Sequence, residues 1–232
     1  MTAHFIALYL LASSIGLCTS KMPQIKEIPT DLEAVDGRDA SLICKTTGVP
    51  HPKITWTHNG KISLPKRFRV LNSGSLHISN LQLEDSGEYT CYAENEFGST
   101  MRSFNFTVRR HTEIMNDLER LAVIAGTKAT FHCKVTHDKN LALRVFWLHN
   151  RKSINFDEEP RFIKTSDHSL IITKTTKMDS GIYTCHAETS LDETAASGAL
   201  IVQDVTEPSQ LKNIPKEVIG YSKENWKKRE YY

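Results

Sequence analysis

Two histidine–cysteine pairs, His132-Cys133 and Cys185-His186, are the residues of this sequence that most readily suggest chemistry. Together they could supply two imidazoles and two thiolates, a donor set that zinc binds in tetrahedral sites. Neighbouring residues of a β-strand point to opposite faces, however. Cysteines that meet in a core would therefore leave these histidines facing outward from opposite sheets. The other histidine spacings match no zinc pattern, and we expect no metal ion and no other cofactor.

Motifs of known catalytic mechanisms are also missing from the sequence. It contains no Gly-Xaa-Ser-Xaa-Gly nucleophile elbow, no phosphate-binding loop and no metalloprotease helix motif. The formal net charge of +2 is too balanced to indicate a nucleic-acid-binding surface. We therefore predict a protein that is not an enzyme, has no catalytic residues and does not bind nucleic acid.

Residues 1–20 have the features of a secretory signal peptide. An apolar run from Phe5 to Ala12 is followed by small side chains, and we expect cleavage between Ser20 and Lys21. The run is shorter than the roughly 20 residues that span a bilayer, and no later segment is longer and as apolar. The sequence thus predicts a secreted, extracellular protein without a membrane span, which could still associate with cell surfaces through a partner.

An internal repeat organises the rest of the chain. The sequence Asp-Ser-Gly-Glu-Tyr-Thr-Cys at residues 85–91 recurs at residues 179–185 with a single change, an offset of 94 residues. Within each copy, apolar and polar residues alternate with the period of two that strands require, and turn signals such as Asn59-Gly60 separate the runs. We expect domains at residues 22–109 and 110–204, followed by a charged tail at residues 205–232.

Each copy has an early cysteine, a tryptophan 12 or 14 residues later and a late cysteine. This pattern resembles the immunoglobulin superfamily, and residues 48–56 and 93–98 resemble its intermediate set. In the second copy, residues 169–176 and 179–185 are similar to the last immunoglobulin domain of the neuroglian group of neural adhesion proteins, which is related to the contactins. The resemblance covers residues 23–205. It implies an all-β fold of two tandem immunoglobulin-like β-sandwich domains.

The resemblance also assigns structural roles to several repeated residues. Four cysteines remain after signal cleavage and allow three connectivities, among which the sandwich implies one disulfide in each domain. A tryptophan should pack on each disulfide, and a tyrosine should form the tyrosine corner. Independently of the resemblance, an arginine lies 18 residues before an aspartate in both copies, and this identical spacing favours an ion pair over a solvated arginine. The residues are Cys44, Cys91, Trp56, Tyr89, Arg67 and Asp85 in the first domain, and Cys133, Cys185, Trp147, Tyr183, Arg161 and Asp179 in the second.

The sequon Asn105-Phe106-Thr107 predicts N-glycosylation at Asn105. It lies on the expected last strand of the first domain, where Phe104, Phe106 and Val108 should face the core. Asn105 should then point outward, where a glycan can be accommodated. A glycan there would keep partners away from that part of the surface.

The neuroglian resemblance implies a cell-adhesion or axon-guidance protein that binds itself or related cell-surface immunoglobulin-superfamily proteins. The alternative is a soluble immune-recognition or ligand-binding protein of the hemolin type. Neuroglian-type proteins continue into fibronectin-type domains, and the tail could be the start of one that is incomplete. The sequence leaves open whether the chain is a short secreted form or a truncated receptor. It identifies no partner-binding residues, although the outer face of the sheet with Trp56 and Tyr92 and the junction near Arg109 are the first places to look.

Overall fold

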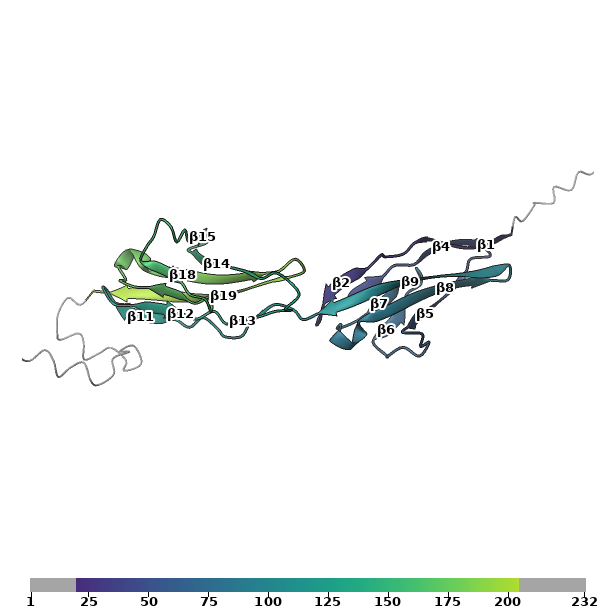
Figure 1. Cartoon of the computed structure of the whole chain (residues 1–232), viewed down its shortest axis with the longest axis horizontal. Helices are drawn as coiled ribbons and strands as arrows, with labels where there is room; N and C mark the ends of the chain where they lie inside the picture. Colours follow the sequence, from purple (N-terminus) through teal and green to yellow (C-terminus); the bar gives the residue numbers. More distant parts are fainter. Residues whose placement is uncertain (1–19, 205–232) are drawn as a thin grey trace, which may run out of the picture. The chain divides into compact units, whose positions relative to one another are not determined.

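The computed structural model describes residues 20–204 of the chain, and Figure 1 shows them as two successive sets of strands. The signal segment, apart from Ser20, and the charged tail lie outside the described residues. The described residues contain strands and two single 3₁₀ turns. The predicted all-β fold of two tandem immunoglobulin-like sandwiches is confirmed.

The first domain consists of two facing sheets and a short strand pair. One sheet has the order β2-β9-β8-β5, the other has the order β3-β7-β6, and β1 pairs with β4. The elements are β1 (Lys21–Glu27), β2 (Leu32–Val35), β3 (Ala40–Leu42), β4 (Lys45–Val49), β5 (Lys53–His58), β6 (Phe68–Val70), β7 (Leu76–Ile78), η1 (Leu83–Asp85), β8 (Gly87–Asn95) and β9 (Gly98–Arg109).

The second domain repeats this arrangement with one additional strand. Its sheets have the orders β11-β19-β18-β14-β15 and β12-β17-β16, and β10 pairs with β13. The elements are β10 (Glu113–Ile114), β11 (Leu121–Ile124), β12 (Ala129–Phe131), β13 (Val135–Thr136), β14 (Arg144–His149), β15 (Lys152–Ser153), β16 (Phe162–Lys164), β17 (Leu170–Ile172), η2 (Lys177–Asp179), β18 (Gly181–Glu188) and β19 (Glu193–Gln203).

Alternation along the strands decides which side chains form each core. In β8, Tyr89, Cys91 and Ala93 are fully buried, and their neighbour Tyr92 is exposed. The same pattern holds in β18, where Tyr183, Cys185 and Ala187 are buried and Ile182 is exposed. Successive side chains of a strand point to opposite sides, so one residue in two enters the space between the sheets.

Strand β11 is parallel to β19, whereas the other paired strands of the second domain are antiparallel. The register joins Leu121 to Leu200 and Ile124 to Gln203. The chain before β11 passes close to β19 at Gly198, where an added Cβ atom would lie 2.8 Å from the Cβ atom of Leu118. A larger residue at this position would push the incoming chain away from the sheet.

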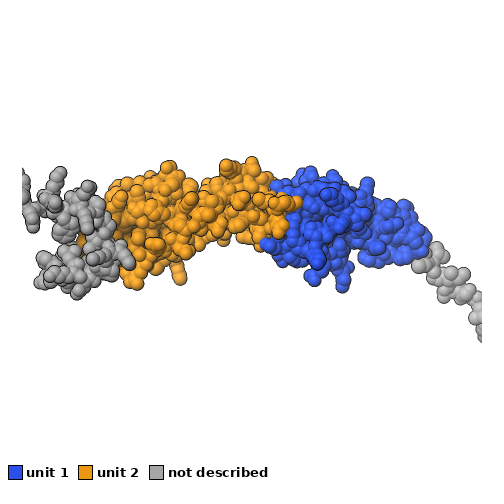
Figure 2. Space-filling view, turned by 90° about the horizontal axis from the view of Figure 1, so that it is seen from below, with its two compact units in different colours: residues 1–32, 39–80, 85–107 blue, residues 33–38, 81–84, 108–232 orange. Residues whose placement is uncertain are grey.

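Figure 2 colours two compact units in the chain. Among the described residues, one unit contains residues 20–32, 39–80 and 85–107, and the other contains residues 33–38, 81–84 and 108–204. Within residues 20–204, no helix is long and apolar enough to cross a lipid bilayer.

Candidate protein-binding surface and the residues that support it

Each domain is closed by one disulfide between its two sheets. Cys44 bonds to Cys91 with a Cα–Cα distance of 6.5 Å, and Cys133 bonds to Cys185 with a distance of 6.4 Å. A buried tryptophan lies directly opposite the second cysteine on the neighbouring strand, Trp56 beside Cys91 and Trp147 beside Cys185. Each indole Nε1 donates a hydrogen bond to a backbone carbonyl, that of Gly74 at 2.9 Å or of His168 at 2.8 Å.

The tyrosine of each domain holds the turn that precedes its strand. The hydroxyl of Tyr89 donates to the carbonyl of Asp85 at 2.8 Å, and the hydroxyl of Tyr183 donates to the carbonyl of Asp179 at 2.8 Å. Burial, followed by the nearby aspartate charge, raises the pKa of both phenols. The hydroxyls therefore stay protonated and remain hydrogen-bond donors at any physiological pH.

The two arginine–aspartate pairs lie beside these tyrosines. Arg67 contacts the buried Asp85 through both terminal nitrogens, and Arg161 contacts the buried Asp179 at 2.8 and 3.1 Å. Burial raises the pKa of Asp179, but hydrogen bonds from Arg161 and from the Thr176 backbone and hydroxyl lower it, so the net pKa is below the usual value. These bidentate pairs fix the turn on which each tyrosine depends.

A further structural cluster in each domain was missed in the sequence. The ring of His149 stacks on Tyr183 with a centroid distance of 4.5 Å, and its Nε2 atom lies 3.2 Å from the amide of Asn150. The Asn150 side-chain oxygen accepts the Ile182 backbone N–H at 2.9 Å. The first domain repeats the cluster with His58, Asn59 and Tyr89. The repeated dipeptide His-Asn, placed 91 residues apart, was the available signal.

This cluster leaves no room for a side chain at Gly181. The residue has φ of +154°, and an added Cβ atom would lie 2.5 Å from the Asn150 Oδ1 atom. We expect Gly181→Ala to destabilise the second domain by about 2–4 kcal/mol, from backbone strain and loss of the Asn150 hydrogen bond. The free energy of unfolding from urea denaturation checks this.

Gly126→Ala is the matched control, because Gly126 also has positive φ but no atom lies within 4 Å of an added Cβ. The free energy of unfolding of this variant should fall by only about 1 kcal/mol, from backbone strain alone. Equal losses at the two positions would contradict the steric role given to the His149–Asn150 cluster.

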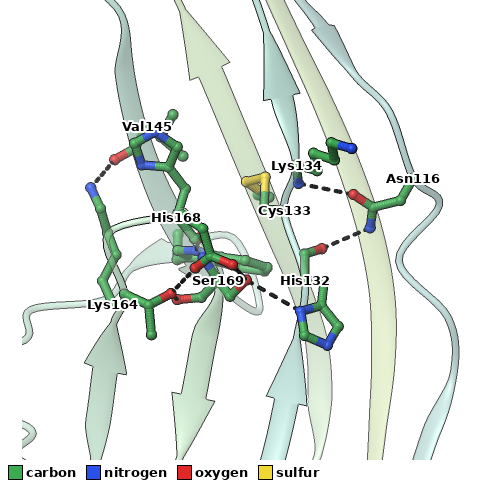
Figure 3. The surroundings of a disulfide bond; sticks show 12 residues. Asn116, His132, Cys133, Lys134, Val145, Lys164, His168 and Ser169 are labelled. Atoms are coloured by element: carbon green, nitrogen blue, oxygen red, sulfur yellow. Dashed lines mark hydrogen bonds between the residues drawn. A yellow bond between two sulfur atoms is a disulfide. The ribbon is translucent and has the colours of Figure 1, made fainter.

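Of the two cysteine-adjacent histidines, His132 directly follows β12, and His186 lies on β18, a strand of the other sheet. His132 is exposed and directed away from Cys133 toward Ser169, with 3.3 Å between its Nδ1 atom and the Ser169 hydroxyl (Figure 3). His186 lies on β18 and stacks on Phe146 with a centroid distance of 4.7 Å. The structure therefore does not bring these histidines together.

His186 instead lies near two carboxylates that sequence spacing did not suggest. Ligand atoms of His186, Glu188 and Glu193 all lie within 4.8 Å of one another. Glu188 already pairs with Arg144 at 3.0 Å. The Nδ1 atom of His186 is buried and has no hydrogen-bond partner among the described residues. Metal binding through Nε2 would place a proton on that buried nitrogen, an unfavourable state, so we assign no metal to this group.

A serine, a histidine and an aspartate line up on the first domain in a manner similar to a hydrolase triad. The Ser41 hydroxyl lies 3.3 Å from the Nδ1 atom of His77, whose Nε2 atom lies 3.5 Å from Asp39. The Asp39 side chain is 60% exposed, so water screens its charge and competes for its hydrogen bonds. A catalytic aspartate must hold the imidazole in one orientation, and we assign no catalytic role to these residues.

The outer face of β5, β8 and β9 is the candidate surface for protein binding. Thr55, Tyr92 and Met101 form one row across these strands, and both Tyr92 and Met101 are exposed. Asn105 lies on the same face of β9, opposite Glu88, and is exposed. This face thus carries the exposed Tyr92 and Met101, and the asparagine of the glycosylation sequon, Asn105, follows Met101 by four residues on β9.

A comparison with family models matches the immunoglobulin I-set domain to residues 23–108 and again to residues 112–202. The chain belongs to the immunoglobulin I-set family. The two matches contain the disulfides, tryptophans, tyrosines and ion pairs described above, so the geometry of those residues is that of two I-set domains.

Similar I-set proteins include neuroglian of Drosophila melanogaster, which is 40% identical over 192 residues, 83% of this chain and 15% of neuroglian. Human protein sidekick-1 is 37% identical over 173 residues, 72% of this chain and 8% of sidekick-1. The predicted resemblance to the neuroglian group is confirmed. The chain spans less than a sixth of the length of these two relatives.

Two solved structures have a similar fold. The insect immune protein hemolin matches with a TM-score of 0.54 and 25% identity, over 79% of this chain and 47% of that chain. Drosophila OTK extracellular domains 3–5 match with a TM-score of 0.59 and 23% identity, over 77% of this chain and 63% of that chain. The match to OTK, at 23% identity, indicates a shared fold only.

Proposed function

We propose that this I-set protein is a secreted cell-adhesion protein of the axon-guidance type, which binds itself or related cell-surface immunoglobulin-superfamily proteins. The observation that carries the proposal is the 40% identity to neuroglian over 83% of the chain. The similarity to sidekick-1 over 72% of the chain and to mouse neuronal cell adhesion molecule over 89% supports the same class of function. Non-enzymatic binding is consistent with the solvated Ser41–His77–Asp39 arrangement.

Export from the cell is part of the proposal. The signal segment proposed for residues 1–20 would deliver the chain to an oxidising compartment, where the two buried disulfides are stable. The proposed domains, residues 22–109 and 110–204, would then present their sheet faces and edges to other proteins. The tail at residues 205–232 is proposed as an incomplete fibronectin-type segment.

A bead assay tests the adhesion proposal. The mature secreted chain is coupled to fluorescent beads, which are mixed alone and with cells that display neuroglian. We expect the beads to aggregate, or to bind these cells in a manner that free protein blocks. Dispersed beads that ignore both other beads and the cells would overturn the proposed function.

The second candidate is soluble immune recognition of the hemolin type. The structural match to hemolin, an insect immune protein whose domain arrangement has implications for homophilic adhesion, is the observation that favours it. The same beads mixed with bacteria distinguish the candidates. Binding to bacteria without binding to cells or to other beads would favour immune recognition.

We propose that Asn105 carries an N-linked glycan. Its side chain is exposed on the outer face of β9, between the buried Phe104 and Phe106, so the sequon is accessible without unfolding. The secreted protein should migrate faster on a denaturing gel after glycosidase treatment, and Asn105→Gln should abolish that shift. Ser103→Ala, a change on the same face outside the sequon, is the control. An unchanged mobility of the untreated and treated wild type would contradict occupancy.

A further inference from the structure

Within residues 20–204, one edge of β5 carries main-chain groups that pair with no other strand. The backbone N–H and carbonyl of His58 bond to Lys61 at 3.0 and 2.9 Å, on the side of β5 away from β8. The next residue, Asn59, instead donates its N–H to the Glu88 carbonyl at 2.8 Å, on the β8 side. Main-chain groups alternate in direction along a strand, so those of Trp56 and Ile54 point to the same outer edge as those of His58.

The second domain covers the corresponding edge. There β15 pairs with β14, and Ile154 donates its N–H to the carbonyl of Trp147, the counterpart of Trp56, at 2.9 Å. Among the described residues of the first domain, β5 is the last strand of its sheet, and only a single bridge from His58 to Lys61 extends beyond it. The edge of β5 in the first domain is thus open among the described residues, whereas β15 covers the corresponding edge of β14 in the second domain.

We infer that this edge pairs with the β5 edge of a second copy of the chain, antiparallel and about a two-fold axis at Thr55. The register follows because His58 already bonds to Lys61, and only the pairing of Ile54 with Trp56 uses the outward main-chain groups of both remaining residues. Ile54 of each copy would then exchange two backbone hydrogen bonds with Trp56 of the other copy. The two sheets would become one continuous sheet, as in other strand-addition interfaces.

The side chains favour a second copy as the occupant. In this register Thr55 lies opposite Thr55 of the other copy, and Lys53 lies opposite Thr57, so no like charges face each other. Lys53 still lies opposite Glu94 of β8, in its own copy. The Thr55 pair would join the two exposed Tyr92 rows into one surface. In a two-fold arrangement the same residues of each copy provide the hydrogen bonds of the pairing, as in other self-complementary interfaces.

The glycosylation sequon is compatible with this edge. Asn105 lies on β9, and β8 separates β9 from β5, so Asn105 is about 10 Å from the open edge at the usual strand spacing. A glycan at that position would obstruct packing of one outer face on another but would leave the edge free. The inference rests on the proposed homophilic adhesion and gives it a defined interface.

A charge-swap experiment tests the pairing. Thr55→Lys and Thr55→Glu each place two like charges at the two-fold axis and should remain monomeric, whereas their equimolar mixture should associate at least as well as the wild type. Sedimentation equilibrium of the mature chain from about 10 µM to about 1 mM covers the affinities expected for an interface this small. Recovery in the mixture also shows that both variants are folded.

Met101→Lys is the matched control, since Met101 lies in the same row but on β9, away from the edge. It should associate like the wild type. The edge pairing would be overturned by any of three results: association of Thr55→Lys like that of the wild type, no recovery of association in the mixture, or loss of association only in Met101→Lys. If Thr55→Lys beads still aggregate like wild-type beads, adhesion stands and the interface is elsewhere. If wild-type beads neither aggregate nor bind cells, the proposed function itself fails.

Discussion

A Cys44→Ala/Cys91→Ala variant is expected to lose about 4 kcal/mol of the free energy of unfolding of the first domain. The disulfide closes a segment with a sequence separation of 47 residues, and its removal restores the conformational freedom of that segment in the unfolded chain. Both cysteines are fully buried, so smaller side chains also leave space in the core. Guanidinium unfolding followed by hydrogen exchange in β8 measures the loss.

The second domain provides the control for this prediction. Cys133→Ala/Cys185→Ala opens a segment with a separation of 52 residues, and chain entropy makes the expected loss nearly the same. Hydrogen exchange should increase in β18 for this variant and in β8 for the first-domain variant. A loss below about 1 kcal/mol in either variant would contradict the entropic explanation.

Arg161→Met is expected to destabilise the second domain by about 3 kcal/mol at neutral pH. The change removes two hydrogen bonds and the opposite charge from Asp179, which remains buried with the two Thr176 donors. A buried carboxylate without its cation is costly, whereas Arg161 itself is partly exposed, which keeps the loss at the lower end of the usual range. Thermal and urea unfolding of the full chain measure it.

The pH dependence distinguishes this role from simple packing. The wild-type pKa of Asp179 lies below the usual value of 3.8, so its stabilising effect is complete above that pH and is lost as pH falls through the lowered pKa. In Arg161→Met the pKa of the same carboxyl should rise, since burial now opposes its charge with less compensation. The difference between wild type and variant should therefore shrink below about pH 4. A difference that is independent of pH would contradict the ionic role.

Residues that recur in both copies of the repeat could be placed from the sequence, because each is tied to one position of a known sandwich. The buried disulfide between Cys133 and Cys185 is an example. The His149–Asn150 contact with Gly181 depends instead on a turn that meets a strand about 30 residues later, which no local pattern encodes. The group around His186 arises from neighbouring strands, and strand register is a property of the folded sheet.

The open edge of β5 could not be predicted for a related reason. The sequences around Trp56 and Trp147 both continue into a turn and a short polar segment. Only the structure distinguishes the single bridge at Lys61 from the paired strand β15. Whether an edge is covered depends on the path of the following loop, which side-chain alternation does not specify.

The parallel pairing of β11 with β19 has a mechanical consequence for a domain under tension. Tension that reaches the second domain through β11 and β19 pulls these two strands in opposite directions along their shared axis. The hydrogen bonds from Leu121 to Gln203 are then loaded together in shear, rather than broken one at a time. If they yield, the Cys133–Cys185 bond still holds 52 residues of chain, about 180 Å of extended length, out of the stretched segment. A domain opened in this way would lengthen only by the chain that lies outside the disulfide, and it could refold from a constrained state.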